Sequence, residues 1–247
     1  EAGDTIVNVS YDFSMYEFYA QLYAVKVATY QKEADLTIDP DKLIAFCKEN
    51  GAKGLIFSNP CNPTSLGLDR ASVRKIIEAL DGCLVILDEA YMDFWDQSLL
   101  DEVNNYDNLI ILKTCSKAIG LAAVRFGFAV SNRTINNAIR AAKSPYNNDT
   151  VAQTIVSDIL SEKEYLKECR DIIVENTKKL YSDIIAINEK YSCFDKIMEP
   201  CTNFVFIITD KYEDIYKFML ENSIAIRKFR GAIRITAGTE AENARFI

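Results

Sequence analysis

Short uninterrupted apolar runs constrain the fold of this chain more than any other feature of its sequence. Four of them are Gly54–Ser58 (GLIFS), Cys83–Leu87 (CLVIL), Leu109–Leu112 (LIIL) and Phe126–Val130 (FGFAV). Each has the length of a strand and lacks the polar alternation of a half-exposed one, which is typical of strands buried on both faces. Because amphipathic helical segments separate the runs, we expect an α/β fold with three layers, in which helices cover both faces of a mostly parallel sheet.

Capping residues mark the helices between these runs. Asp39-Pro40 supplies an N-cap and a first helical residue, and Asn50-Gly51 ends the same helix. Asp69 is placed to cap the next helix. The apolar residues of that helix keep a helical spacing: Val73, Ile76, Ile77 and Leu80.

The sequence changes in character after about Ser144-Pro145. The residues that mark a long amphipathic helix are Leu166, Cys169, Ile173, Leu180, Ile184, Ile187 and Tyr191. Strands are expected at Phe204–Ile208, Ile224–Ile226 and Ala232–Thr236, with a helix near Tyr212–Glu221. We therefore predict a large domain over residues 1–144, and over residues 145–247 a long linking helix followed by a smaller α+β domain.

The composition excludes several classes of function. The 28 basic and 36 acidic side chains give a net charge of −8 without any basic block, which disfavours a nucleic acid or an anionic membrane as partner. The chain has no histidine, so Ser-His-Asp triads, Cys-His pairs and His-ligated zinc sites are impossible within it. Its seven cysteines include no C-x-x-C pair, and we expect free thiols in a reducing cytoplasm.

Polar residues follow three of the expected strands. Asn59–Thr64 (NPCNPT) follows the first, Asp88–Tyr91 (DEAY) the second and Lys113–Lys117 (KTCSK) the third, with Arg125 eight residues further on. Ligands of open α/β sheets bind at the carboxyl ends of the strands, so these side chains are expected to share one crevice. Singly, each has an ordinary structural explanation, such as a helix cap, a turn or a solvated charge. The ordered set favours a ligand site.

Four blocks in this order resemble the fold-type I, pyridoxal-phosphate-dependent aminotransferases of classes I and II: NPCNPT, DEAY, SKAIGLAAVRFG and IRITAGT. Two further stretches, YDFSMYEFYAQLYAVKV and IAIR…IRITAGTEAEN, resemble the histidinol-phosphate aminotransferase branch. The resemblance covers essentially the whole chain. It implies a transaminase of histidine biosynthesis that moves an amino group from an amino donor, expected to be histidinol phosphate, to a 2-oxo acid. It also implies a cytoplasmic homodimer with no nucleic-acid or membrane partner.

The cofactor implied by the resemblance is pyridoxal 5'-phosphate, bound by residues 1–144. Lys117 would hold its aldehyde as an imine and act as the catalytic base. Asp88 would pair with the pyridine nitrogen, and Tyr91 and Asn62 would form hydrogen bonds with the ring hydroxylate. No metal is implied.

The remaining matching residues would hold the cofactor phosphate and the ring. Ser116 and Arg125 are the expected phosphate ligands, with Thr114 assisting. Phe13 would stack on the ring, and Tyr16 is either an alternative to it or part of the core.

Arg234 is expected to hold the substrate carboxylate through two hydrogen bonds, and Arg227 is either a second substrate contact or a surface charge. Two features depart from the family pattern. Ser65 occupies the position of the glycine in the family motif NPTG, so we expect this loop to be altered. The start, EAGDTIVNV, resembles the interior of a family chain, and we expect this piece to bind the cofactor weakly or not at all.

Two alternatives remain open at this point. A threonine-phosphate decarboxylase resembles the same branch and uses the same lysine, and its product, carbon dioxide, would distinguish it from a transaminase. The other alternative is a non-catalytic domain that keeps the fold. Retention of Lys117, Asp88 and Arg234 disfavours the second alternative.

Overall fold

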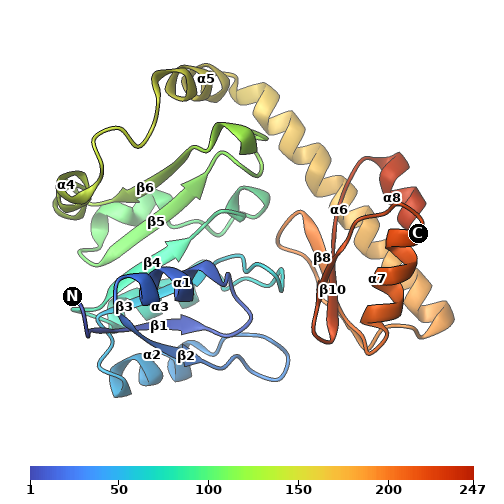
Figure 1. The fold of residues 1–247 in the computed structure, drawn as a ribbon, viewed down its shortest axis with the longest axis horizontal. Coiled ribbons are helices and arrows are strands. Elements are labelled where there is room, and N and C mark those ends of the chain that lie inside the picture. Colours follow the sequence, from blue (N-terminus) through green and yellow to red (C-terminus); the bar gives the residue numbers. More distant parts are fainter.

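The computed structural model describes residues 1–247 and contains two β-sheets, which Figure 1 shows connected by a long helix. The elements of the first part are β1 (Thr5–Val9), α1 (Met15–Leu22), β2 (Lys26–Tyr30), α2 (Pro40–Glu49), β3 (Gly54–Ser58), α3 (Arg70–Ala79), β4 (Leu84–Asp88), η1 (Met92–Phe94), η2 (Leu100–Asn105), β5 (Leu109–Thr114), η3 (Ala122–Val124), β6 (Gly127–Ser131) and α4 (Arg133–Ala142). Those of the second part are α5 (Thr150–Ser161), α6 (Lys163–Tyr191), β7 (Lys196–Ile197), β8 (Phe204–Ile208), α7 (Tyr212–Glu221), β9 (Arg227–Phe229), β10 (Ala232–Thr236) and α8 (Glu240–Phe246).

The first sheet has six strands in the order β2-β1-β3-β4-β5-β6. Strands β1 to β5 are parallel, and only β6 runs antiparallel to its neighbour β5. The prediction of an α/β fold with a mostly parallel sheet is confirmed. Strand register brings Ser58, Asp88 and Leu112 side by side at the carboxyl ends of β3, β4 and β5.

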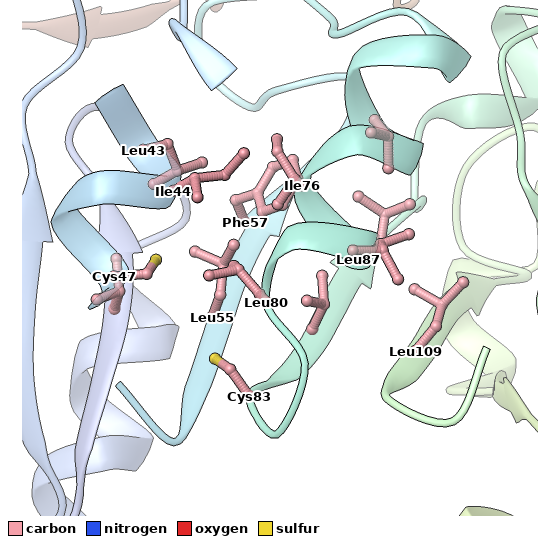
Figure 2. Packing of buried hydrophobic residues seen from close by; sticks show 14 of the residues in the cluster. Leu43, Ile44, Cys47, Leu55, Phe57, Ile76, Leu80, Cys83, Leu87 and Leu109 are labelled. Atoms are coloured by element: carbon pink, nitrogen blue, oxygen red, sulfur yellow. The ribbon is translucent and has the colours of Figure 1, made fainter. Parts of the chain in front are cut away.

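The main hydrophobic core lies on the face of this sheet that α2 and α3 cover (Figure 2). Leu55 and Phe57 of β3, Leu43 of α2 and Ile76 of α3 are all completely buried. Each such side chain contributes about 2 kcal/mol relative to an exposed one. The predicted N-caps are in place, because Asp39 accepts hydrogen bonds from two backbone N–H groups of α2, as Asp69 does from one of α3.

The opposite face of the first sheet is covered less completely. Ile56 and Ile86 point to this face and are only partly buried. Helix α1 packs here, yet Leu22 and Tyr23 near its end are 64% and 71% exposed. An apolar surface therefore borders α1.

The second sheet has the order β7-β8-β10-β9 and is antiparallel throughout. Leu180 and Ile184 of α6 pack on Val205 and Ile233 of this sheet and form a second core. The strands expected at 204–208 and 232–236 and the helix at 212–221 are confirmed.

The strand expected at Ile224–Ile226 is wrong, because β9 begins only at Arg227. The tight turn at Gly231, which has a φ of 76°, sets the hairpin register. In that register the residues opposite β10 are 227–229.

The domain boundary between residues 144 and 145 stays a prediction, and it falls in the connection between α4 and α5. No helix combines the length and the apolar character that crossing a membrane requires.

Candidate active site

A pocket of about 350 Å³ lies at the carboxyl ends of β3, β4 and β5. Its volume is in the range of small-molecule sites. The structure brings together around it all eight residues predicted to contact a cofactor: Phe13, Asn62, Asp88, Tyr91, Thr114, Ser116, Lys117 and Arg125. The individual roles of these residues stay predictions. Tyr16, Ser58, Ala90, Leu112 and Lys113 complete the lining.

Asp88 ends β4 at the floor of the pocket, and both of its carboxylate oxygens are held. The backbone N–H of Ala90 donates to Oδ1 at 2.9 Å, and the phenol of Tyr16 donates to Oδ2 at 2.6 Å. Burial, together with the nearby Asp88 charge, raises the pKa of Tyr16, so this phenol keeps its proton. Tyr16 therefore orients Asp88, whereas the exposed Phe13 is the aromatic side chain with an edge-to-face contact to Tyr16.

Two lysines line the pocket, and their surroundings differ. Lys113 Nζ lies 2.6 Å from Asp93 and 3.7 Å from Glu89, a fully buried carboxyl whose pKa is raised by burial. Lys117 Nζ has no ion-pair partner and lies 5.1 Å from the centre of the Tyr91 ring. The amine available for chemistry is therefore that of Lys117. Lys113 belongs to the segment Lys113–Lys117 that was expected at the crevice, and it does line the pocket, but its ion pairs distinguish it from Lys117.

One end of the pocket combines hydroxyl, amide and guanidinium donors. The backbone N–H of Ser116 donates to Thr114 Oγ1 at 3.1 Å. Arg125 has a left-handed backbone with φ 56° and follows η3. Gly127 two residues later has no room for a side chain, because a Cβ would lie 2.8 Å from the carbonyl oxygen of Lys113. This close approach of β6 to β5 fixes the start of β6, two residues after Arg125, which lines the pocket together with Ser116.

Arg234 of β10, on the second sheet, does not line the pocket itself but contacts the lining residue Asn62. Its Nη1 donates to Asn62 Oδ1, and its guanidinium lies 4.6 Å over the ring of Phe204. Its Nε is buried without any hydrogen-bond partner, and burial lowers the pKa of the group. A buried cation with an unpaired donor costs free energy unless an anion pairs with it. The arrangement therefore favours an anionic ligand. Arg227 lies opposite Arg234 on β9, is exposed and does not line the pocket.

Asp12 is a second carboxylate near the pocket, and sequence reasoning missed it. It accepts hydrogen bonds from the backbone N–H and the hydroxyl of Ser58 and from the backbone N–H of Phe13. Burial raises its pKa to about 6, and Lys32 opposes this shift. No motif signals Asp12, since its partner Ser58 is 46 residues away in sequence.

A larger groove of about 700 Å³ lies between the η1–η2 segment and α6. It shares only Lys113 with the pocket described above. Of its basic residues, Lys167 and Arg170 are paired with Asp171 and Lys113 with Asp93, which leaves only Lys163 unpaired, so it lacks a comparable set of free donors.

Comparisons with known proteins identify the family of this chain. The family model for aminotransferase class I and II matches residues 1–247. A histidinol-phosphate aminotransferase of Clostridium kluyveri is 38% identical over 98% of this chain and 69% of its own length.

Solved structures share the fold. The histidinol-phosphate aminotransferase of Clostridium acetobutylicum superposes with a TM-score of 0.89 at 22% identity, covering 99% of this chain and 76% of that one. The corresponding enzyme of Sinorhizobium meliloti, solved in complex with pyridoxal-5'-phosphate, gives 0.86 at 22% identity and covers 100% of this chain and 69% of that one. The chain belongs to the family of class I and II aminotransferases.

Proposed function

We propose that this aminotransferase uses pyridoxal 5'-phosphate to move an amino group from histidinol phosphate to a 2-oxo acid. The observation that carries the proposal is the convergence of Asp88, Tyr91, Asn62 and the unpaired Lys117 on one pocket of about 350 Å³. When bound, the cofactor supplies a conjugated ring that withdraws electrons from the carbon bearing the substrate amine.

The donor set fits this cofactor, and we therefore propose that the chain binds it at saturating concentration, although the start of the sequence led us to expect weak binding or none. Asp88, fixed through both oxygens, is an acceptor for a ring N–H. The Oδ1 of Asn62 accepts from Arg234, which leaves its Nδ2 to donate to a ring oxygen, and the phenol of Tyr91 is a second donor. Ser116 and Arg125 would hold the phosphate, with Thr114 bonded to Ser116.

Lys117 would hold the aldehyde of the cofactor and, once released, carry a proton to and from the reacting carbon. An amine can accept a proton only through a free lone pair, and carboxylate partners would keep it protonated. Lys113 has such partners in Asp93 and Glu89, and Lys117 has none. Because of its carboxylate partners, Lys113 would remain a charged lysine at the edge of the pocket and would not hold the aldehyde.

Histidinol phosphate is the proposed donor because the site favours a phosphate-bearing amine. Arg234, beside the pocket, has a buried Nε without a partner, and the exposed Arg227 lies opposite it on the β9–β10 ladder, outside the pocket lining. Two guanidinium groups on neighbouring strands repel each other, and a doubly charged phosphate relieves this repulsion better than a single carboxylate. The name of the Clostridium kluyveri relative supports the same donor.

Purified protein with added cofactor tests the proposal. Histidinol phosphate and 2-oxoglutarate should yield glutamate without carbon dioxide, and threonine phosphate should yield no carbon dioxide. Lys117→Ala should abolish glutamate formation, and Lys190→Ala, a surface lysine on α6, is the matched control. Release of carbon dioxide would instead favour the decarboxylase alternative.

We further propose a cytoplasmic homodimer that serves histidine biosynthesis. The exposed Leu22 and Tyr23 support burial of the α1 surface against a second copy. Seven free cysteines, none of them paired, support a reducing compartment. Light scattering after gel filtration measures the mass, and a monomer at micromolar concentration would contradict the dimer.

A further inference from the structure

Ser65 is a serine in a backbone conformation that favours glycine. Its φ is 64°, in the left-handed region, and the residue is completely buried. A side chain in this conformation persists only where its surroundings hold it. The contacts of the Ser65 hydroxyl therefore bear on how the chain holds a serine where the family motif has glycine.

The hydroxyl of Ser65 joins the two sheets. Its Oγ lies 2.5 Å from Thr202 Oγ1 and donates to the carbonyl oxygen of Phe204 at 3.1 Å. The backbone N–H of Cys201 donates in return to the Ser65 carbonyl oxygen at 3.0 Å. Both hydroxyls are buried, so none of these bonds competes with water.

These contacts continue on both sides to the candidate substrate site. On one side, the backbone N–H of Ser65 donates to the carbonyl oxygen of Cys61, which closes a tight turn around Asn62. On the other side, Phe204 carries the ring beneath the Arg234 guanidinium. The Arg234–Asn62 hydrogen bond then completes a closed ring of contacts between the sheets.

We infer that Ser65 and Thr202 are positioning residues that fix the position of the Arg234 guanidinium relative to Asn62. They thereby determine how well Arg234 binds the substrate anion. This inference rests on the proposed function. A glycine at position 65 would adopt the same backbone without strain but would remove the side-chain bonds from the first sheet's loop to Thr202 and Phe204, leaving only the bonds that these two residues make within the second sheet. Anion recognition should then change beyond any loss of overall stability.

Two stable ligands isolate anion recognition without turnover. Phosphopyridoxyl-alanine and phosphopyridoxyl-ethylamine differ only in the carboxylate, which represents the anion of the 2-oxo acid substrate. The ratio of their dissociation constants therefore measures what this carboxylate contributes. Calorimetry gives this ratio for the wild type, Ser65→Gly and Thr202→Val. Thr202→Ser keeps the hydroxyl and is the matched control.

We expect the wild type and Thr202→Ser to prefer the alanine adduct equally. Ser65→Gly and Thr202→Val should each reduce the ratio about two- to tenfold, the usual effect of losing one hydrogen bond. Binding of the ethylamine adduct should be unchanged. In hydrogen exchange of the free protein, the Cys201 amide should exchange faster in Ser65→Gly than in the wild type.

Each failure has its own signature. If the wild type binds neither adduct, the proposed function is wrong and the inference falls with it. If both adducts bind and the ratio is the same in all four proteins, the positioning role is wrong and the proposed function stands. A ratio that falls in Thr202→Ser as much as in Thr202→Val would also overturn the role of the hydroxyl.

Discussion

Replacing Asp12 by asparagine should change how the stability of this protein depends on pH. The carboxylate of Asp12 is held against Ser58, and burial raises its pKa from 3.8 to about 6. The folded state therefore binds a proton more tightly than the unfolded state does. Stability from this group is present below pH 3.8 and is lost as the pH rises through 6.

The magnitude follows from the two pKa values. Keeping Asp12 ionised at neutral pH costs about 3 kcal/mol, since each tenfold change in affinity for a proton is worth about 1.4 kcal/mol. Lowering the pH from about 7.5 to about 5 ends one pH unit below the folded value and should recover about 1.4 kcal/mol. The Asp12→Asn variant should not recover this free energy, because asparagine does not titrate.

The assay is urea unfolding of the wild type and Asp12→Asn at both pH values. As the pH falls, the free energy of unfolding of the wild type should increase by about 1.4 kcal/mol relative to that of Asp12→Asn. Asp35→Asn is the control, because the bonds from Thr37 lower the pKa of Asp35 and its difference should not move in that direction. A wild-type-minus-Asp12→Asn difference that is equal at both pH values would refute the reasoning.

Three further substitutions test other parts of the account. Tyr16→Phe removes one of the two donors to Asp88 and should weaken cofactor binding about two- to tenfold in a fluorescence titration, whereas unchanged affinity would contradict its orienting role. Gly67→Ala places a Cβ 2.2 Å from the Trp95 ring and should cost about 1–3 kcal/mol in urea unfolding, so a neutral result would rule out that packing. Asp69→Ala removes the N-cap bond to Ser72 and should cost about 1 kcal/mol at neutral pH. Because the α3 N–H lowers the pKa of Asp69, this loss should shrink as the pH falls below 3.8, and a loss that persists in acid would contradict the capping role.

Features with local causes were predictable from the sequence. Asp39 and Asp69 cap helices through neighbours two or three residues away, and GLIFS forms a strand over the expected residues. The gathering of Asp88 and Lys117 at one sheet edge follows from strand order, which parallel α/β connections restrict. Once the strand order was expected, no further knowledge of contacts between distant residues was needed to predict these parts of the site.

Features with distant causes were not predictable. The hydrogen-bond partners of Ser65 are 137 and 139 residues away in sequence. The motif therefore showed that serine replaces glycine, but not which residues hold the serine. Tyr16 meets Asp88 across 72 residues. The β9 boundary depends on the Gly231 turn, which sets the pairing with β10, and the apolar residues at 224–226 gave a stronger strand pattern than 227–229.

The most direct test of the central claim asks which amine holds the cofactor. Protein mixed with pyridoxal 5'-phosphate is reduced with borohydride, digested and analysed by peptide mass spectrometry. We predict a phosphopyridoxyl mark on Lys117 and none on Lys113, whose amine is paired with Asp93. A mark on Lys113, or no mark on Lys117 at saturating cofactor, would contradict it.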